Sequence, residues 1–234
     1  MNLQDQVCLI TGAAKGIGLA TARHLLARGA RVACLDLEDC PEPKALSVCG
    51  DVTRAADVEK AVAEVTQRLG PVSVWINNAG LARHRWIQDY SEEEIDLMLA
   101  VNLKGTILGS QAALRSMIPR RCGHIINIIS TASLRGIPSE TVYCAAKWGV
   151  RGFTQGLAEE AAAHRIRVTA LLPGGVDTAF WNEASSREAP RQLFLKAEHI
   201  ADAIVSCLEM EDYCVPRELV LRSLDDSDFS VKPA

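Results

Sequence analysis

Short, unbroken apolar runs alternate with amphipathic stretches along the whole chain. Runs of this length are typical of strands that are buried on both faces of a parallel sheet. They predict strands over residues 7–10, 31–36, 46–49, 72–76, 124–130, 167–172 and 219–222. Apolar residues at helical spacing predict helices over residues 19–26, 55–69, 91–118, 141–164 and 197–208, and the third of these is expected to break near Asn102.

Strands that alternate with helices in this way favour the α/β class, as a single-domain, doubly wound Rossmann fold over residues 1–234. With right-handed crossovers the seven strands form a mostly parallel sheet in the order 3-2-1-4-5-6-7, with helices on both faces. Ligands bind such sheets at the carboxyl ends of the strands. The polar tail over about residues 225–234 is expected to be frayed.

Glycines follow the first predicted strand in the pattern G-x-x-x-G-x-G, at Gly12, Gly16 and Gly18. A strand that passes through glycines into a helix points backbone N–H groups and the positive end of the helix dipole at one spot, where a pyrophosphate can bind. A Cβ at these positions would keep the backbone from the phosphate, or the helix from the strand. Taken alone, the motif also fits a plain tight turn.

Composition and charge exclude several classes of protein. The 234 residues are 48% hydrophobic with a net charge of −4, and the basic residues are scattered, so we expect no nucleic-acid partner. The polar N-terminus runs directly into the first strand and no apolar run approaches the ~18 residues of a membrane span, so neither a signal peptide nor a membrane anchor is expected. Eight cysteines without metal-ligand spacing favour a reduced, cytoplasmic protein with no metal.

Tyr143 and Lys147 are spaced i, i+4, so on one helix they share a face. An ammonium about 5 Å from a phenol oxygen, at an effective dielectric of about 20, would favour the phenolate by roughly 3 kcal/mol, or about two pKa units. Such a tyrosine could exchange protons near neutral pH. The pattern Y-x-x-x-K arises by chance in many helices, so its weight depends on its context.

That context resembles the short-chain dehydrogenase/reductase family, from Val7 to at least Thr178. The chain carries T-G-x-x-x-G-x-G at residues 11–18, N-N-A-G at 77–80, Y-x-x-x-K at 143–147 and P-G-x-V-x-T at 173–178. Ser130 and Asn102 match the two remaining catalytic positions of the family. The family often has a second serine just before the catalytic one, where this chain has Ile129, a change expected to affect packing only.

The resemblance implies a role for each of these four residues. Tyr143 would be the general acid/base and Ser130 would orient the substrate oxygen. Lys147 would lower the pKa of the tyrosine and hold the nicotinamide ribose. Asn102 would anchor a water for proton relay, at a helix break where a freed main-chain group can hold it.

The resemblance also implies a nicotinamide cofactor, with direct hydride transfer and no metal. The matching cofactor positions are Gly12, Lys15, Gly16, Ile17, Gly18, Asp36, Asp51, Val52, Asn78, Ala79, Gly80, Tyr143, Lys147, Pro173, Gly174, Val176 and Thr178. Asp36 ends the second strand, where a carboxylate accepts hydrogen bonds from the ribose diol of NAD and repels the 2′-phosphate of NADP. Lys15 favours NADP, but acidic residues follow Asp36, so NAD is expected and NADP is less favoured.

These features predict an NAD(H)-dependent oxidoreductase that interconverts a secondary alcohol and a ketone or aldehyde. The alternatives are an NADP(H)-preferring carbonyl reductase and a catalytically silent nucleotide-binding regulatory or scaffold protein. A family member that performs epimerisation or dehydration with bound NAD is a further alternative, for which a much longer substrate domain would be expected. Loss of Ser130, Tyr143 or Lys147 would have favoured the silent protein, and all three are present.

The identity of the small-molecule substrate stays open. By the resemblance, residues 178–197 form a lid, whose aromatic residues either line an apolar pocket or pack on a helix; they are Phe180, Trp181 and Phe194. Three apolar residues are expected beside the active site: Ala132, Leu134 and Ile137. The loop at residues 83–86, made of Arg83, His84, Arg85 and Trp86, either meets an acidic substrate group or is solvated.

A homodimer or homotetramer is a further expectation, because members of the family usually associate through the long helices before and after the fifth strand. Five glycines in these helices would let two chains approach closely, or would serve packing within the chain: Gly105, Gly109, Gly149, Gly152 and Gly156.

Overall fold

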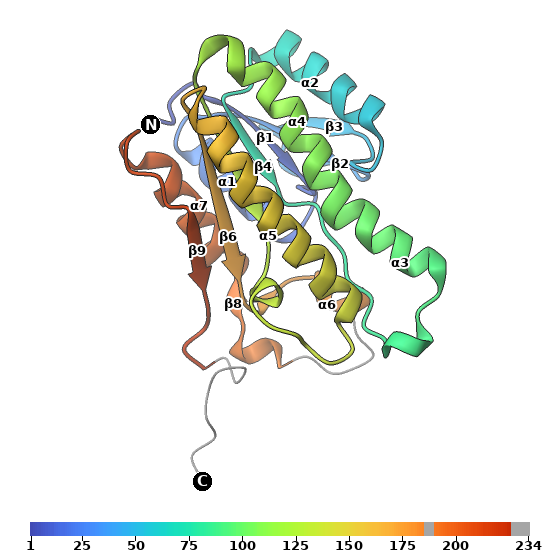
Figure 1. The fold of residues 1–234 in the computed structure, drawn as a ribbon. Coiled ribbons are helices and arrows are strands. Elements are labelled where there is room, and N and C mark those ends of the chain that lie inside the picture. Colours follow the sequence, from blue (N-terminus) through green and yellow to red (C-terminus); the bar gives the residue numbers. More distant parts are fainter. Residues whose placement is uncertain (185–189, 226–234) are drawn as a thin grey trace.

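The computed structural model describes residues 1–184 and 190–225. Its centre is a seven-stranded sheet in the order β3-β2-β1-β4-β5-β6-β9, in which all six pairings are parallel (Figure 1). The strands are β1 (Val7–Thr11), β2 (Arg31–Asp36), β3 (Leu46–Cys49), β4 (Val74–Asn77), β5 (Gly123–Ile128), β6 (Ile166–Pro173) and β9 (Glu218–Leu221). The predicted fold class and strand order are therefore confirmed, with β9 as the seventh strand of the sheet.

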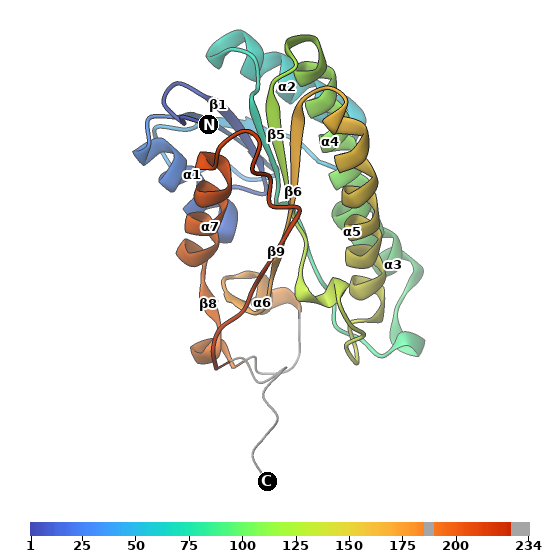
Figure 2. The same cartoon turned by 60° about the vertical axis from the view of Figure 1, so that its left-hand side comes forward.

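Helices cover both faces of the sheet (Figure 2). On one face α1 (Gly16–Ala27) packs beside α7 (Ala197–Glu209), and on the other lie α2 (Ala55–Leu69), α4 (Gly105–Met117) and α5 (Thr141–Ala162). Successive residues of β1 serve the two cores, because neighbouring side chains on a strand point to opposite faces. Ile10 joins the core under α1 and α7, and Leu9 joins the core under α2, α4 and α5.

The long helix expected before the fifth strand is continuous from Glu92 to Arg120. It comprises α3 (Glu92–Leu99), a π-helical turn (Ala100–Lys104), α4 and a short 3₁₀ turn (Ile118–Arg120). The predicted break near Asn102 is thus a π turn inside the helix rather than an end. By length and composition this helix could cross a membrane, but it packs against α5 and the sheet as a core helix of a soluble protein does.

Two strands are shorter than predicted. β4 begins at Val74 instead of residue 72, and β5 ends at Ile128 instead of residue 130. The second difference has a local cause: Ser130 accepts a hydrogen bond from Ala132 N at 3.1 Å and caps a 3₁₀ turn (Thr131–Ser133), which turns the chain out of the sheet.

A second, two-stranded sheet that the hydrophobic pattern did not predict joins the residues just before the expected lid to the end of the lid. It pairs β7 (Val176–Asp177) with β8 (Leu195–Lys196), and α6 (Phe180–Ala184) lies between them in the chain. Strands of two residues are too short to leave a periodic signal. The lid prediction over residues 185–189 and the fraying prediction over 226–234 lie outside the described residues.

Candidate functional site

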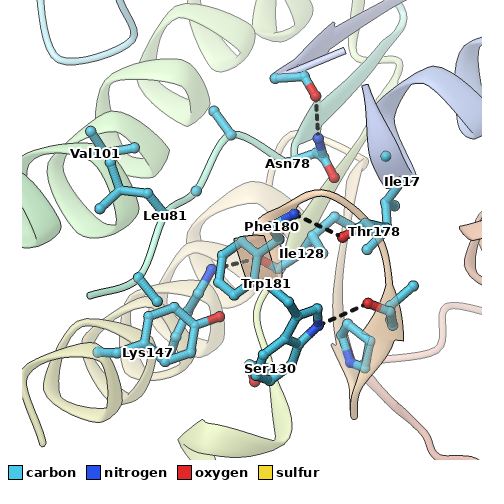
Figure 3. Close-up of a pocket in the computed structure, with 18 of the residues that line it drawn as sticks. Ile17, Asn78, Leu81, Val101, Ile128, Ser130, Lys147, Thr178, Phe180 and Trp181 are labelled. Atoms are coloured by element: carbon cyan, nitrogen blue, oxygen red, sulfur yellow. Dashed lines mark hydrogen bonds between the residues drawn. The ribbon is translucent and has the colours of Figure 1, made fainter. Parts of the chain in front are cut away.

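A cleft of about 820 Å³ opens at the carboxyl ends of the strands, between the loop before α1 and the segment around α6. Figure 3 shows side chains from α5, α6 and the segment after β5 converging on it, among them Lys147, Trp181 and Ser130. All but two of the predicted site residues line this cleft. The exceptions are Gly18 and Asn102, which lie behind its wall.

The glycine loop is closed so tightly that side chains are excluded. Gly12 has φ +65°, and a Cβ there would come within 2.7 Å of Ala79 Cα. A Cβ on Gly18 would come within 2.4 Å of Gly12 O, so Gly18 serves the packing of the loop instead of touching a ligand. The first turn of α1 has no acidic residue and no side-chain cap, which leaves its positive end directed at the cleft.

The N-N-A-G segment after β4 is fastened to the glycine loop. Asn78 Nδ2 donates to Thr11 O at 2.9 Å and to Gly12 O at 2.7 Å. In return Thr11 Oγ1 accepts from the backbone N–H groups of Asn78 and Ala79, both at 3.0 Å. These four hydrogen bonds hold the two loops that form one end of the cleft in a single arrangement.

Acidic groups dominate the cleft beside β2 and β3. Asp36 Oδ2 accepts from Ala14 N at 2.8 Å and Asp36 Oδ1 from Leu37 N at 2.7 Å. Lys15 Nζ, the one basic candidate at this end, lies 3.1 Å from Glu38 Oε1. Asp51 also lines the cleft there, so carboxylates outnumber the ammonium at the position where β2 ends.

The three predicted residues of the proton-transfer group meet at the other end of the cleft. Tyr143 and Lys147 lie one turn apart on α5, with Lys147 Nζ 5.6 Å from the centre of the Tyr143 ring. Lys147 Nζ donates to Ile128 O at 3.2 Å, which ties α5 to the end of β5 (Figure 3). Ser130 lies just beyond that strand end and lines the same part of the cleft as Tyr143.

Burial controls the protonation of this group. Desolvation raises the pKa of the Tyr143 phenol above its ordinary value, the carboxylate of Glu140 raises it further, and the hydrogen bond from Ser130 opposes them. Desolvation also lowers the pKa of Lys147 to about 8. In the protein alone the pKa of Tyr143 is therefore raised, where the spacing of Tyr143 and Lys147 predicted a lowered pKa, because the phenol is buried.

Asn102 is fully buried in the π turn behind Gly80. Its Nδ2 donates to Leu81 O at 2.7 Å and to Met98 O at 2.9 Å. Its main-chain carbonyl accepts from Thr106 Oγ1 at 2.8 Å, so that group, expected to be freed by the break, has a partner. Instead the side-chain Oδ1 has no hydrogen-bond partner among the described residues, and it faces the same glycine as Lys147 Nζ.

Aromatic side chains form the cleft wall opposite Tyr143. Trp181 lies 5.0 Å from Phe194 and 5.8 Å from Phe180 between ring centres, and its Nε1 donates to Val176 O at 2.9 Å. Phe180 in turn lies 6.0 Å from Tyr143. Of the two interpretations of these residues, the structure favours pocket lining, because all three face the cleft.

The other residues expected near the substrate divide between cleft and core. Ile137 lines the cleft, but Ala132 and Leu134 do not, because they turn inward and pack on α5 and its neighbours. Ile129 is 2% exposed and packs against Val150, as expected for a packing position, and it also lines the cleft.

Of the four residues in the loop after N-N-A-G, two line the cleft and two do not. Arg83 and His84 line the cleft, whereas Arg85 pairs with Glu94 at 3.3 Å and Trp86 is 54% exposed. Only the first half of this loop can therefore meet a ligand in the cleft.

Sequence reasoning missed two charged residues of the cleft wall, Arg135 and Glu140. The sequence did contain a signal for Glu140, because it precedes Tyr143 by three positions, a spacing that favours neighbouring side chains at the start of a helix. The sequence contained no such signal for Arg135, because its position depends on the path of the loop between β5 and α5.

Comparison with known proteins identifies the family. The family model for short chain dehydrogenases matches residues 6–189. The chain is 38% identical over 186 residues to 2-(S)-hydroxypropyl-CoM dehydrogenase 3 of Xanthobacter autotrophicus, which covers 75% of this chain and 73% of that protein. It is 35% identical over 216 residues to acetoacetyl-CoA reductase of Synechocystis, covering 89% and 90%.

Among solved structures, an alcohol dehydrogenase from the archaeon Thermococcus sibiricus, complexed with 5-hydroxy-NADP, has a TM-score of 0.85 and 30% sequence identity. The match covers 94% of this chain and 97% of that one. The chain therefore belongs to the short-chain dehydrogenase/reductase family of NAD(P)-dependent oxidoreductases, which act on CH–OH or carbonyl groups.

Proposed function

We propose that the protein is an NAD(H)-dependent oxidoreductase that interconverts a secondary alcohol and a ketone, with Tyr143 as the general acid/base. One observation carries the proposal: Ser130, Tyr143 and Lys147 meet at one end of a cleft whose other end holds the glycine loop and Asp36. Proton transfer and nucleotide binding are thus joined in one cavity.

The residues present fit a bound NAD(P). Gly12 and Gly18 occupy positions where a Cβ would collide with the backbone, and the uncapped start of α1 is suited to the pyrophosphate. Pro173, Gly174, Val176 and Thr178 line the cleft between that loop and Tyr143, where they would hold the nicotinamide end. The cofactor, when bound, supplies or accepts a hydride at C4 of its nicotinamide ring.

Residues of the chain itself would transfer the proton to and from the substrate oxygen. The Tyr143 phenol donates it to the carbonyl oxygen during reduction and removes it from the hydroxyl during oxidation. Ser130 hydrogen-bonds to the same oxygen and orients it. Lys147, with a pKa of about 8, can hold or release a proton near neutral pH. Asn102 Oδ1 is an acceptor that would position a water behind Lys147.

Preference for NAD over NADP is part of the proposal. Asp36, Glu38 and Asp51 supply negative charge where β2 ends, and a 2′-phosphate would be repelled there. Lys15 is paired with Glu38, which weakens it as a phosphate partner. The solved relative from Thermococcus sibiricus is bound to an NADP derivative, so NADP(H) remains the alternative to be tested.

Three further properties belong to the proposal. The aromatic wall supports a substrate with an apolar body. One sheet that spans β1 to β9 supports a single domain. The eight free cysteines support a location in the reducing cytoplasm. The open outer face of α5 supports a homodimer or homotetramer.

Cofactor titration tests the function directly. The purified protein is titrated with NADH and separately with NADPH, and energy transfer from its tryptophans, of which Trp181 lines the cleft, reports binding. Tight NADH and weak NADPH binding are expected, followed by turnover in a screen of ketones and secondary alcohols. Tight binding of NADPH alone would overturn the NAD preference, and binding of neither would revive the scaffold alternative.

A further inference from the structure

The loop after β4 and the loop before α5 meet beside Tyr143 on the substrate side of the cleft, where hydrogen bonds join them. Arg85 N, after β4, donates to Ser139 O, before α5, at 2.9 Å. The Tyr90 hydroxyl lies 2.6 Å from Arg83 O and 3.2 Å from the same Ser139 O. Ser139 is 8% exposed and has φ +64°, a conformation that costs a non-glycine residue energy and persists where the surroundings enforce it.

The contact between these two loops, called the junction below, holds an acidic and a basic side chain inside the cleft wall. His84 Nε2 lies 3.7 Å from Glu140 Oε1, and the two side chains are 7% and 16% exposed. The His84 ring also meets Trp181 edge to face, at 5.8 Å between ring centres. The Glu140 carboxylate is thereby kept in a poorly solvated place, where its charge acts over a longer range than it would in water.

Glu140 is also placed to act on Tyr143. It is the N-cap residue of α5, Tyr143 is the third residue of that helix, and both line the cleft. The Glu140 carbonyl accepts from Cys144 N at 2.7 Å, which fixes this first turn. A carboxylate there disfavours a negative charge on the phenol, and it raises the pKa of Tyr143 in the same direction as burial.

Other charged and titratable groups of the described residues surround the junction. Arg83 and Arg135 line the cleft, Arg85 is paired with Glu94 of α3, and Lys147 lies one turn beyond Tyr143. Burial raises the pKa of the Cys144 thiol and that of the Tyr90 phenol, and the Glu140 carboxylate raises both further. The other carboxylates of the described cleft wall lie beside β2 and β3; they are Asp36, Glu38 and Asp51.

We propose that Glu140, held in place by His84, is a positioning residue for the acid–base step, whose charge acts on Tyr143 and extends carbonyl reduction to higher pH. The inference rests on the proposed function, in which Tyr143 is the acid. During reduction the phenol O–H bond breaks, the carbonyl oxygen takes the proton, and the phenolate is reprotonated from solvent. A carboxylate beside the phenol keeps that proton in place at a pH where the phenol alone would lose it.

Fluorine NMR on protein labelled with 3-fluorotyrosine tests this without any substrate. The chain has three tyrosines, so three resonances are expected, and Tyr143→Phe identifies the relevant one. Fluorine makes the phenol more acidic, which brings its ionisation into an accessible pH range. Glu140→Gln should lower the ionisation midpoint of Tyr143 by about one pH unit. The ionisation midpoint of Tyr213, which is 92% exposed, should not change.

Two matched variants separate charge from structure. Glu140→Asp keeps the carboxylate and should keep the midpoint near that of the wild type. Glu160→Gln removes an exposed carboxylate at the far end of the same helix and should leave the midpoint unchanged. Circular dichroism checks that each variant is folded.

An unchanged Tyr143 midpoint in Glu140→Gln, or an equal shift in Glu160→Gln, would overturn the inference. The proposed function fails separately, if Tyr143→Phe keeps its turnover. With a ketone that the wild type reduces, the high-pH limb of kcat/KM should move down in Glu140→Gln by the same amount as the NMR midpoint.

Discussion

At the scale of single residues, Tyr143 gives the sharpest test of the chemistry. Tyr143→Phe removes one hydroxyl from a ring that is 8% exposed, so the fold and the nucleotide end of the cleft should stay intact. General acid–base catalysis contributes about 10²- to 10⁴-fold, so kcat should fall by at least about 100-fold while the Kd for NADH stays within about twofold. Steady-state kinetics and NADH fluorescence measure the two quantities. Tyr213→Phe, at an exposed tyrosine, is the control and should keep its activity.

Asp36 decides between the two cofactors, in our proposal, through its negative charge. Asp36→Asn keeps an oxygen that can accept from Ala14 N or Leu37 N, so the loop should hold its shape. Loss of the charge should shift the ratio of the Kd values for NADH and NADPH by about 10-fold toward NADPH. Parallel fluorescence titrations measure the ratio, with Asp89→Asn, an exposed and distant change, as the control. An unchanged ratio would assign the selection to Lys15 instead.

Lys147 makes the stability of the fold depend on pH. Its pKa is about 8 in the folded protein against 10.5 ordinarily, so between these values the unfolded chain binds a proton that the folded chain does not. The free energy of unfolding therefore gains a contribution that rises with pH, by about 2 kcal/mol from about pH 8 to about pH 10.

Urea unfolding at both pH values measures this contribution as the difference between the wild type and Lys147→Met, which lacks it. Other titrating groups, such as Tyr143 with its raised pKa, act equally in both proteins and cancel. Lys60→Met, at an exposed lysine, should show the same pH dependence as the wild type. If the wild type and Lys147→Met have equal pH dependence, the buried ammonium does not titrate as described.

At the scale of elements, a buried amide network joins the centre of the sheet to two helices. Asn77 Nδ2 donates to Asn127 Oδ1 at 2.8 Å and to Ser110 Oγ at 2.9 Å. Asn127 Nδ2 donates to Thr154 Oγ1 at 2.9 Å, and Trp75 Nε1 donates to Asn77 Oδ1 at 2.7 Å. β4, β5, α4 and α5 are thus connected by hydrogen bonds that have no access to water.

Asn127→Ala should destabilise the protein by about 2–4 kcal/mol, because it leaves buried partners on β4 and α5 unsatisfied and opens a cavity. The free energy of unfolding in urea measures the loss. Asn182→Ala, at an exposed position, should cost almost nothing. A loss below about 1 kcal/mol for Asn127→Ala would mean that the network relaxes around the change.

Most elements could be predicted from the sequence because each strand of a parallel sheet is an apolar run in its own right. Asn127 is a polar residue between apolar neighbours in HIINIIS, and the network accounts for it. The pairing of β7 with β8 could not be predicted, because contacts distant in sequence create it. At the site, motif residues were found by spacing, whereas Arg135 depends on a loop path and the protonation of Tyr143 on burial, neither of which spacing encodes.

At the scale of the whole molecule, the structure divides the five glycines of α4 and α5 into two groups. A Cβ on Gly105, Gly109 or Gly149 would press on Val52, Asn77 or Leu103, so these three serve packing within the chain. Gly152 and Gly156 have open space beyond them. With Trp148, 48% exposed, they lie on one face of α5 at i, i+4 and i+8.

This face supports the proposed homo-oligomer, because small residues let a second helix approach closely and the exposed indole would lose its contact with water. Light scattering at micromolar concentration should give a dimer or tetramer. Gly152→Arg places a charged side chain on the open face and should shift the mass to that of a monomer. Tyr213→Asp, at a residue that is 92% exposed and outside α5, should leave the mass unchanged. A wild type that is monomeric at this concentration would contradict the oligomer, and an unaffected Gly152→Arg assembly would place the interface on another face.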